Sequence, residues 1–187
     1  MKHFRTPASM AIQAGFSLLE VLITIVILAF GLLGLAGLQA KTQSYTTESF
    51  QRAQGILLIQ EMANRVSANR ANAANYVTTA PLGTGDSQGT SCAGLTGARQ
   101  DLCEWSLELK GTSEQQSGSG ASMGAMLGAR GCIEQLATNP TVIRISVAWQ
   151  GMNEFQAPSL TCGQNLYGRD GFRRTIASIV AVANLAN

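Results

Sequence analysis

Hydrophobic side chains are distributed very unevenly along this chain. Residues 16–38 form a nearly continuous apolar run in which Glu20 is the only charged side chain. Beyond the run, apolar residues recur at spacings of three and four, the repeat of one helical face; they are Ile56, Ile59, Ala63 and Val66. Because no proline occurs between positions 8 and 80, the pattern predicts a single helix over residues 16–74.

Later in the chain, apolar and polar residues alternate with a period of two. Apolar residues at 143, 145, 147 and 149 alternate with Arg144, Ser146 and Ala148, the pattern of a half-buried strand. Residues 132–136 and 172–183 predict two further strands, with a turn at residues 139–140. A long helix followed by a small antiparallel sheet predicts an α+β fold.

The connecting segments are richer in glycine and polar residues. Residues 81–97 predict a loop, and residues 111–131 are a Gly/Ser/Met-rich stretch that we expect to be flexible. Between them, Asp101 and Glu104 fit a capping box at the start of a short helix. The apolar face of that helix consists of Leu102, Trp105 and Leu109.

The length of the apolar run predicts a retained membrane anchor rather than a cleaved secretory signal. Crossing a bilayer takes about 20 residues, which residues 16–38 supply, whereas the apolar region of a signal peptide is shorter. Residues 38–41 match a small-x-small cleavage site poorly. Because Lys2 and Arg5 precede the run, we expect a cytoplasmic N-terminus and a body outside the inner membrane.

Glu20 does not fit a simple anchor. A carboxylate at the bilayer centre costs roughly 2.5 kcal/mol or more, although near the interface it costs less and can snorkel. A cation at the same depth would offset this cost. Cleavage after Gly15 would create an ammonium group on Phe16, four residues before Glu20, so that the amine of a neighbouring subunit could meet the acid.

Residues 15–21, Gly-Phe-Ser-Leu-Leu-Glu-Val, resemble the class III signal of type IV prepilins and type II secretion pseudopilins. The resemblance implies cleavage between Gly15 and Phe16 by a prepilin peptidase, followed by N-methylation of Phe16. It also implies that Glu20 helps dock subunits into a growing filament. The fold it implies is the pilin fold, a long N-terminal helix packed on a small antiparallel sheet.

Residues 27–39 and 65–72 more specifically resemble the PilV-type minor pilins, the type IV pilus modification proteins, and the likeness covers roughly the first 75 residues. Major pilins commonly carry a proline near Gly37, which is absent here. Gly31, Gly34 and Gly37 are expected to loosen the helix instead, each at about 1 kcal/mol relative to alanine. Close packing of helices through small residues is the other interpretation of these glycines.

These assignments divide the chain into four parts. Residues 1–15 are a leader that is cleaved, and residues 16–38 are the transmembrane half of the long helix. Residues 39–75 are its periplasmic half. Residues 76–187 form a globular antiparallel-sheet domain with a short helix and Gly/Ser loops.

The four cysteines predict two disulfides in an oxidising compartment. Three pairings are possible. We favour Cys92 with Cys103 and Cys132 with Cys162, because pairing neighbours in sequence closes each loop at the lowest entropic cost.

Composition argues against most enzyme chemistry. The lone histidine, His3, leaves the body without an imidazole base, and no Cys-x-x-Cys pair is present to start a zinc site. Lys2 and Arg5 account for the formal net charge of +2, so the remaining 11 basic and 11 acidic groups cancel. We expect no catalytic residue, metal or cofactor, and a neutral body gives no electrostatic footprint for nucleic acid.

Two further pairs of residues have ordinary interpretations. Arg173 and Arg174 point to opposite faces of a predicted strand and are expected to be solvated. Trp105 and Trp149 are expected in the core.

The sequence therefore predicts a structural and assembly protein, a minor pilin that takes part in type IV pilus assembly and so in adhesion and motility. Expected partners are other minor pilins, the major pilin, a prepilin peptidase/methyltransferase, the inner-membrane assembly platform and a tip adhesin, with no nucleic acid. We expect a single-pass inner-membrane protein that enters the pilus after assembly. Two alternatives remain: an I-type minor pseudopilin of a type II secretion system, or a DNA-uptake or adhesive pilin whose loops bind a ligand. The Gly/Ser insertions favour the pilus over the first, and the neutral body argues against DNA.

Overall fold

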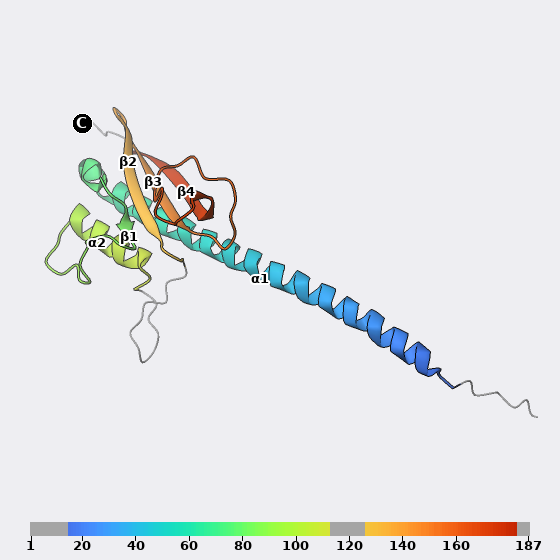
Figure 1. Ribbon diagram of the computed structural model, residues 1–187. Helices are drawn as coiled ribbons and strands as arrows, with labels where there is room; N and C mark the ends of the chain where they lie inside the picture. The colour runs from blue at the N-terminus through green and yellow to red at the C-terminus, as the bar shows by residue number, and fades with distance from the viewer. Residues whose placement is uncertain (1–14, 113–125, 183–187) are drawn as a thin grey trace, which may run out of the picture. The chain divides into compact units, whose positions relative to one another are not determined.

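The computed structural model describes residues 15–112 and 126–182 of the 187-residue chain. The predicted leader, apart from Gly15, and most of the stretch expected to be flexible lie outside the described residues. Contacts divide the chain into two compact units, residues 1–43 and 44–187, which are described separately. The elements follow one another in the order α1, η1, β1, α2, β2, β3, η2, β4. Figure 1 labels the two α-helices and the strands.

Helix α1 spans Leu18–Ala68, so the predicted long helix is correct over most of its length and wrong at its end. Arg70–Tyr76 form a 3-10 helix, η1, instead. Between the two, Asn69 has φ −112° and ψ 42°, outside the α-helical range, so the α-helix ends here. The Asn69 side-chain oxygen accepts a hydrogen bond from the side-chain amide of Asn72 at 2.8 Å.

The buried stripe of α1 in the second unit differs in part from the predicted one. It consists of Gln51, Gly55, Ile59, Met62 and Val66. The spacing also predicts Ile56 and Ala63, but Ile56 is 43% exposed and Ala63 only half-buried. Gly55 replaces a larger residue because a Cβ there would lie 2.9 Å from the side chain of Ile176. An apolar pattern alone cannot reveal a close approach made through glycine.

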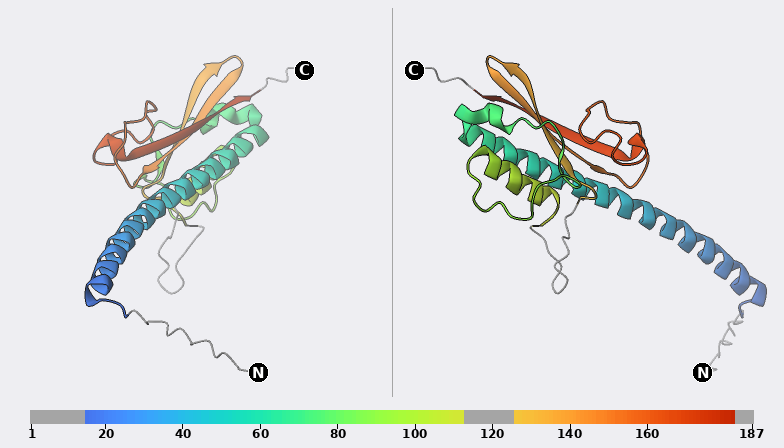
Figure 2. Two further views of the ribbon diagram at one scale, coloured as in Figure 1. Left: turned by 90° about the vertical axis from the view of Figure 1, so that its right-hand side faces the viewer. Right: turned by 60° about the vertical axis from the view of Figure 1, so that its left-hand side comes forward.

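A four-stranded antiparallel sheet, in the order β1-β2-β3-β4, packs on residues 44–68 of α1 (Figure 2). Its strands are β1 (Leu82–Gly83), β2 (Arg130–Thr138), β3 (Thr141–Gln150) and β4 (Arg173–Val182), the last preceded by the 3-10 turn η2 (Asp170–Phe172). The turn at residues 139–140 joins β2 to β3 as predicted. Strand β1 lies inside the predicted loop and is too short to show alternation. The α+β fold class is confirmed.

Strand β3 is buried on both faces, which its alternating pattern does not predict. Ile143, Ile145, Val147 and Trp149 belong to the main core shared with α1. On the opposite face, Ser146 is 1% and Ala148 0% exposed. A second small cluster covers that face, made of Cys132, Ala148, Cys162 and Tyr167. The segment between β3 and β4 therefore acts as a third layer over the sheet.

Both favoured disulfides are present. Cys92 and Cys103 are joined with a Cα–Cα distance of 5.8 Å, and Cys132 and Cys162 with one of 5.7 Å. The first connects the segment after β1 to helix α2, and the second holds the outer layer to β2.

Helix α2 spans Ala98–Leu109, so the predicted short helix is present but its capping box is wrong. The helix begins three residues earlier, and the Asp101 N–H already donates to the Gly97 carbonyl at 3.1 Å. The Asp101 carboxylate instead accepts a hydrogen bond from the Tyr76 hydroxyl. Trp105 is fully buried, and its indole N–H donates to the Leu58 carbonyl at 3.0 Å, which fixes α2 on α1.

The prediction of solvated arginines at the start of β4 is wrong. Arg173 is 1% exposed, and its guanidinium donates to the Asp170 carboxylate at 2.7 Å and to the Cys162 carbonyl at 3.1 Å. Arg174 pairs with Glu48 at 3.2 Å and lies 4.5 Å from the ring of Phe155. A buried guanidinium needs such partners, and here they tie down the segment between β3 and β4.

Candidate processing and assembly site

The predicted cleavage position lies directly before the first helical turn. Residues 15–17 are not helical, and α1 starts at Leu18. The Ser17 carbonyl accepts hydrogen bonds from the N–H groups of Glu20 at 3.0 Å and Val21 at 3.2 Å, so Ser17 closes the first turn. Phe16 is 83% exposed. Gly15 and Phe16 are therefore exposed and lie outside the helix, where a peptidase can reach them.

Every residue from 15 to 43 is exposed in this chain. α1 contains a window of mean hydropathy 2.7 that is long and apolar enough to cross a membrane, and none of that window is buried within the protein. The exposed side chains include 15 large hydrophobic residues between positions 16 and 38. No described residue covers these side chains, and an exposed apolar surface of this size indicates contact with a membrane or with another protein.

A comparison of transfer free energies shows that Glu20 does not prevent insertion of the helix into a membrane. Burying each large apolar side chain contributes about 1.5–3 kcal/mol, which gives roughly 20 kcal/mol or more for the run. One carboxylate in a membrane costs only about 2.5–3.5 kcal/mol on insertion scales. The helix can therefore enter a bilayer with Glu20 charged.

Glu20 is placed favourably by the helix but lacks a counter-ion within the described part of the chain. It lies in the first turn of α1, where the helix dipole stabilises negative charge. Among residues 15–112 and 126–182, no cation lies within salt-bridge distance of it. The polar hydroxyl of Thr24 nearby is satisfied by its own helix, because it donates to the Val21 carbonyl at 2.8 Å.

The three glycines predicted to loosen the helix all lie inside α1, which continues through them. A Cβ added at Gly31, Gly34 or Gly37 would have no atom within 4 Å. No contact with the described residues therefore requires glycine there. Loosening and close packing against another helix both stay predictions.

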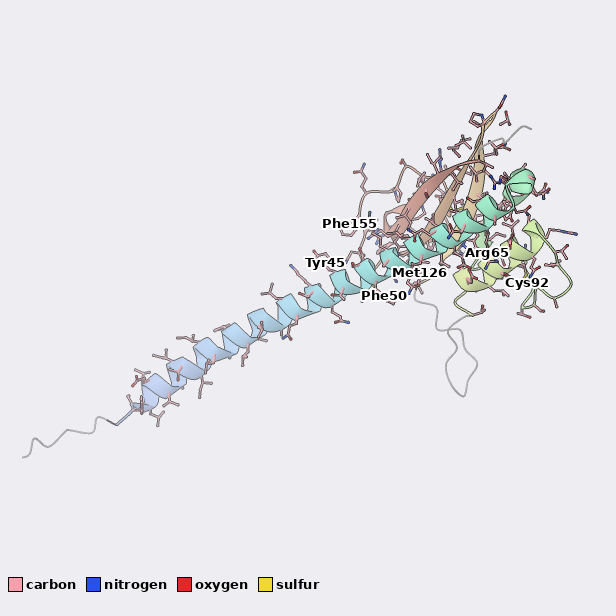
Figure 3. All side chains as sticks on the ribbon, turned by 180° about the vertical axis from the view of Figure 1, so that it is seen from behind. Tyr45, Phe50, Arg65, Cys92, Met126 and Phe155 are labelled. Atoms are coloured by element: carbon pink, nitrogen blue, oxygen red, sulfur yellow. A yellow bond between two sulfur atoms is a disulfide. The ribbon has the colours of Figure 1, made fainter. Side chains whose placement is uncertain are left out.

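The second unit contains a dense charge cluster that the sequence reasoning missed. At its centre is Arg65 on α1, which Figure 3 labels. The Arg65 guanidinium lies 2.6 Å from Glu61, 3.4 Å from Asp101, 2.5 Å from Glu104 and 3.1 Å from Glu108. The last three residues belong to α2. The available signal was the i,i+4 spacing of Glu61 with Arg65 and of Glu104 with Glu108.

The cluster shifts the protonation of its members. Burial opposes the charge on Arg65, but hydrogen bonds to Glu61 and Glu104 outweigh it and raise the pKa of the guanidinium. Burial, and then a hydrogen bond with Glu61, raises the pKa of Glu108 to about 7. The hydrogen bond from Arg65 lowers the pKa of Glu104. Within the described residues, no group of His, Cys, Asp or Glu is arranged to hold a metal, so we interpret the cluster as the joint between α1 and α2.

A family model described as the prokaryotic N-terminal methylation motif matches residues 10–36 of the chain. No curated protein and no solved structure matches it. The matched segment contains Gly15, Phe16 and Glu20 together with most of the apolar run.

This match identifies an N-terminal methylation signal of the prepilin type, on a chain whose α+β fold is consistent with the type IV pilin fold. The motif implies processing by a prepilin peptidase and assembly with other pilins. Together with the exposed apolar helix it indicates membrane anchoring and incorporation into a pilus.

Proposed function

We propose that this protein is a minor pilin that takes part in type IV pilus assembly, by priming the fibre or entering it, and so in adhesion and motility. It acts by coassembling with the major pilin and other minor pilins. The globular domain has no catalytic role in this proposal.

One observation carries the proposal: the fully exposed apolar segment 16–38 contains a single carboxylate, Glu20, placed one turn after the exposed residues Gly15 and Phe16. A helix that served only as a membrane anchor would not be stabilised by a carboxylate within its apolar segment. A filament subunit gains a specific contact, because the leader leaves behind an ammonium group on Phe16 that can pair with Glu20 of a neighbour.

The magnitudes favour this pairing. Two opposite charges about 4 Å apart attract with roughly 4 kcal/mol at an effective dielectric constant of 20. Holding Glu20 charged in the membrane costs about 2.5–3.5 kcal/mol. The pair therefore offsets the cost of the carboxylate, whereas an unpaired Glu20 does not.

In this account Lys2 and Arg5 hold the N-terminus in the cytoplasm, where the peptidase cleaves after Gly15, and the body is periplasmic. An oxidising periplasm agrees with the two disulfides of the domain. Gly31, Gly34 and Gly37 give the anchor the freedom or the close approach it needs among other helices.

Intact-mass measurement of the protein from membranes tests the processing step. We expect a mature chain that starts at Phe16, carries one methyl group on its amine, and retains four oxidised cysteines. A chain that keeps its first 15 residues would contradict the proposal.

Deleting the gene tests the biological role. We expect loss or reduction of surface pili, with secreted enzymes unaffected. Unchanged piliation with lost secretion would overturn the proposal in favour of a minor pseudopilin of a type II secretion system.

A further inference from the structure

Three large apolar side chains are exposed at the end of the second unit that follows the apolar run in the chain. Tyr45 is 63% exposed, and Met152 and Phe155 are each 55% exposed. Tyr45 lies on the first turn of α1 in this unit, and the other two lie in the segment that follows β3. Figure 3 labels Tyr45 and Phe155. We call these three residues the end patch.

The three side chains gather around one ion pair. The Glu48 carboxylate lies 3.2 Å from the Arg174 guanidinium and accepts a hydrogen bond from the Met152 N–H at 3.0 Å. Arg174 in turn lies 4.5 Å from the centre of the Phe155 ring. Tyr45 lines the same cavity as Glu48 and Arg174. Apolar side chains that gather on one surface mark an interaction site, whereas single ones do not.

The segment after β3 is fixed in place although residues 152–157 are all exposed. The Phe155 N–H donates to the Gly171 carbonyl at 2.8 Å, and the Asn153 side-chain amide donates to the Ser44 hydroxyl at 3.1 Å. A segment that is already ordered loses little conformational entropy when it binds. These hydrogen bonds therefore hold apolar side chains in water in a form suited to binding.

The chain itself ties the end patch closely to the apolar run. Leu38 ends the run, and Tyr45 follows seven residues later within α1. Seven helical residues rise roughly 10 Å, and even a fully extended stretch of this length spans at most about 25 Å. This limit depends only on the length of the chain, whatever the orientation of the two units.

If the run spans a membrane, as the proposed function requires, the end patch lies within reach of the bilayer surface. The headgroup layer adds about 5–8 Å on each side of the apolar core. Side chains of a helix lean toward its N-terminus, so the ring of Tyr45 is directed back along α1. Tyrosine is enriched at the membrane interface because its ring is apolar and its hydroxyl is polar.

We propose that the end patch binds the phospholipid surface beside the anchor and holds the globular domain against the membrane until the chain enters the fibre. Met152 and Phe155 leave water for the interface, and the Tyr45 hydroxyl stays among the headgroups. The charge of Arg174, which lies between them, is offset by Glu48. The contact is therefore mainly hydrophobic, and a neutral headgroup suffices.

A lipid surface fits the end patch better than a separate protein does. Stable protein–protein interfaces bury about 1,200–2,000 Å² in total, far more than three side chains supply. A membrane contact needs no such area, because the anchor keeps the lipid within reach and the contact forms at a high effective concentration.

Photocrosslinking of the full-length chain in vesicles of phosphatidylcholine tests the proposal, because these vesicles contain a neutral lipid and no other protein. The probe is p-benzoylphenylalanine at position 155, and the control has the same probe at Leu136, an exposed residue of β2. The neighbours of Leu136 pair with Ile143 and Val142, roughly 25 Å along β3 from the end that leads to Met152. We expect a mass increase of one phospholipid with the probe at 155 and none with the probe at 136.

Matched variants test the other two members of the end patch, with the probe kept at position 155. Combining Tyr45→Ser with Met152→Ser should reduce the lipid adduct about tenfold, because two of the three side chains no longer gain from leaving water. Leu136→Ser should leave the adduct unchanged. Because all the replaced side chains are exposed, the variants should unfold at the same temperature as the parent.

Flotation of the vesicles separates this inference from the proposed anchoring. A chain that floats with the vesicles but gives no lipid adduct at 155, or equal adducts at 155 and 136, would overturn the inference alone. An adduct to a second copy of the chain in place of lipid would do the same, as would a parental yield from the double serine variant. A chain that does not float would overturn both.

Discussion

The two compact units of this molecule differ in how much of their apolar surface is buried within the protein. In residues 15–43 every side chain is exposed, including 15 large hydrophobic ones. In the second unit, α1, α2 and the sheet bury Trp105, Met62 and Ile145 almost completely, and two disulfides staple the loops. Among the described residues, those of the second unit form a core and those of the first do not.

The difference shows where partners must act. The first unit depends on lipid or on other subunits for its stability, so its few polar features, above all Glu20, are candidates for specific contacts. The second unit folds around its own core, with fewer large apolar side chains, such as Phe50 and Phe155, left exposed. We therefore expect the contacts that define the function in residues 15–43, whose apolar side chains and Glu20 have no partner among the described residues.

Blocking the processing site should have the largest effect. In Gly15→Val, a Cβ added at position 15 has no atom of the described residues within 4 Å, so we expect any loss to come from recognition rather than from misfolding. We expect uncleaved protein that stays in the membrane and is absent from sheared pili, seen as a mass increase corresponding to the 15-residue leader. Normal maturation of Gly15→Val would contradict the assignment.

Replacing Trp105 at the centre of the core should destabilise the second unit and leave membrane anchoring by the first unit intact. Trp105 is fully buried and also donates to the Leu58 carbonyl, so Trp105→Ala should cost about 3–5 kcal/mol of stability. Proteolysis should then degrade the domain, while the anchor still pellets with membranes. The exposed Leu136→Ala serves as control and should change stability by less than about 0.5 kcal/mol.

Arg65 tests whether the charge cluster joins α1 to α2. Arg65→Met leaves four carboxylates without their cation, which should cost about 2 kcal/mol at neutral pH in chemical denaturation. The loss should shrink toward pH 4 as the carboxylates take up protons. A loss independent of pH would assign the effect to packing alone.

Replacing Glu108 should change the free energy of unfolding less than replacing Arg65, and in the opposite direction. The pKa of Glu108 rises from 4.5 to about 7 on folding, so between these values the folded state binds more protons and stability falls as pH increases. Glu108→Gln should therefore raise stability by roughly 1 kcal/mol at pH 8 and have little effect at pH 4. Thermal unfolding across this pH range measures it, and a destabilised Gln variant at pH 8 would refute the sign.

Much of the molecule could be predicted from its sequence because the signals are local. The apolar run, the alternation in β3 and the order of the cysteines are each visible within a short window. Cys92 with Cys103 and Cys132 with Cys162 follow from short loop closure. The candidate site was visible for the same reason, since Gly15, Phe16 and Glu20 lie within six residues.

What could not be predicted depends on contacts between distant segments. Ser146 and Ala148 are buried because a segment without periodicity covers them. Arg173 is buried because that same segment supplies its carbonyl partners. The Arg65 cluster requires α2 to dock on α1, and the close approach at Gly55 requires β4 beside the helix. No pattern within one element carries that information.

The central claim is that Glu20 acts in assembly rather than in anchoring. The direct test measures, for four chains, the ratio of mature protein in sheared pili to that in membranes: the parent, Glu20→Ala, Glu20→Gln and Thr24→Ala. Thr24 lies one turn away and bonds only its own helix, so its variant should match the parent. Glu20→Ala and Glu20→Gln should both insert and be cleaved, yet fall about tenfold or more in pili, because neither can pair with the amine of Phe16. Parental levels of Glu20→Gln in pili would show that the charge is not needed and would contradict the account.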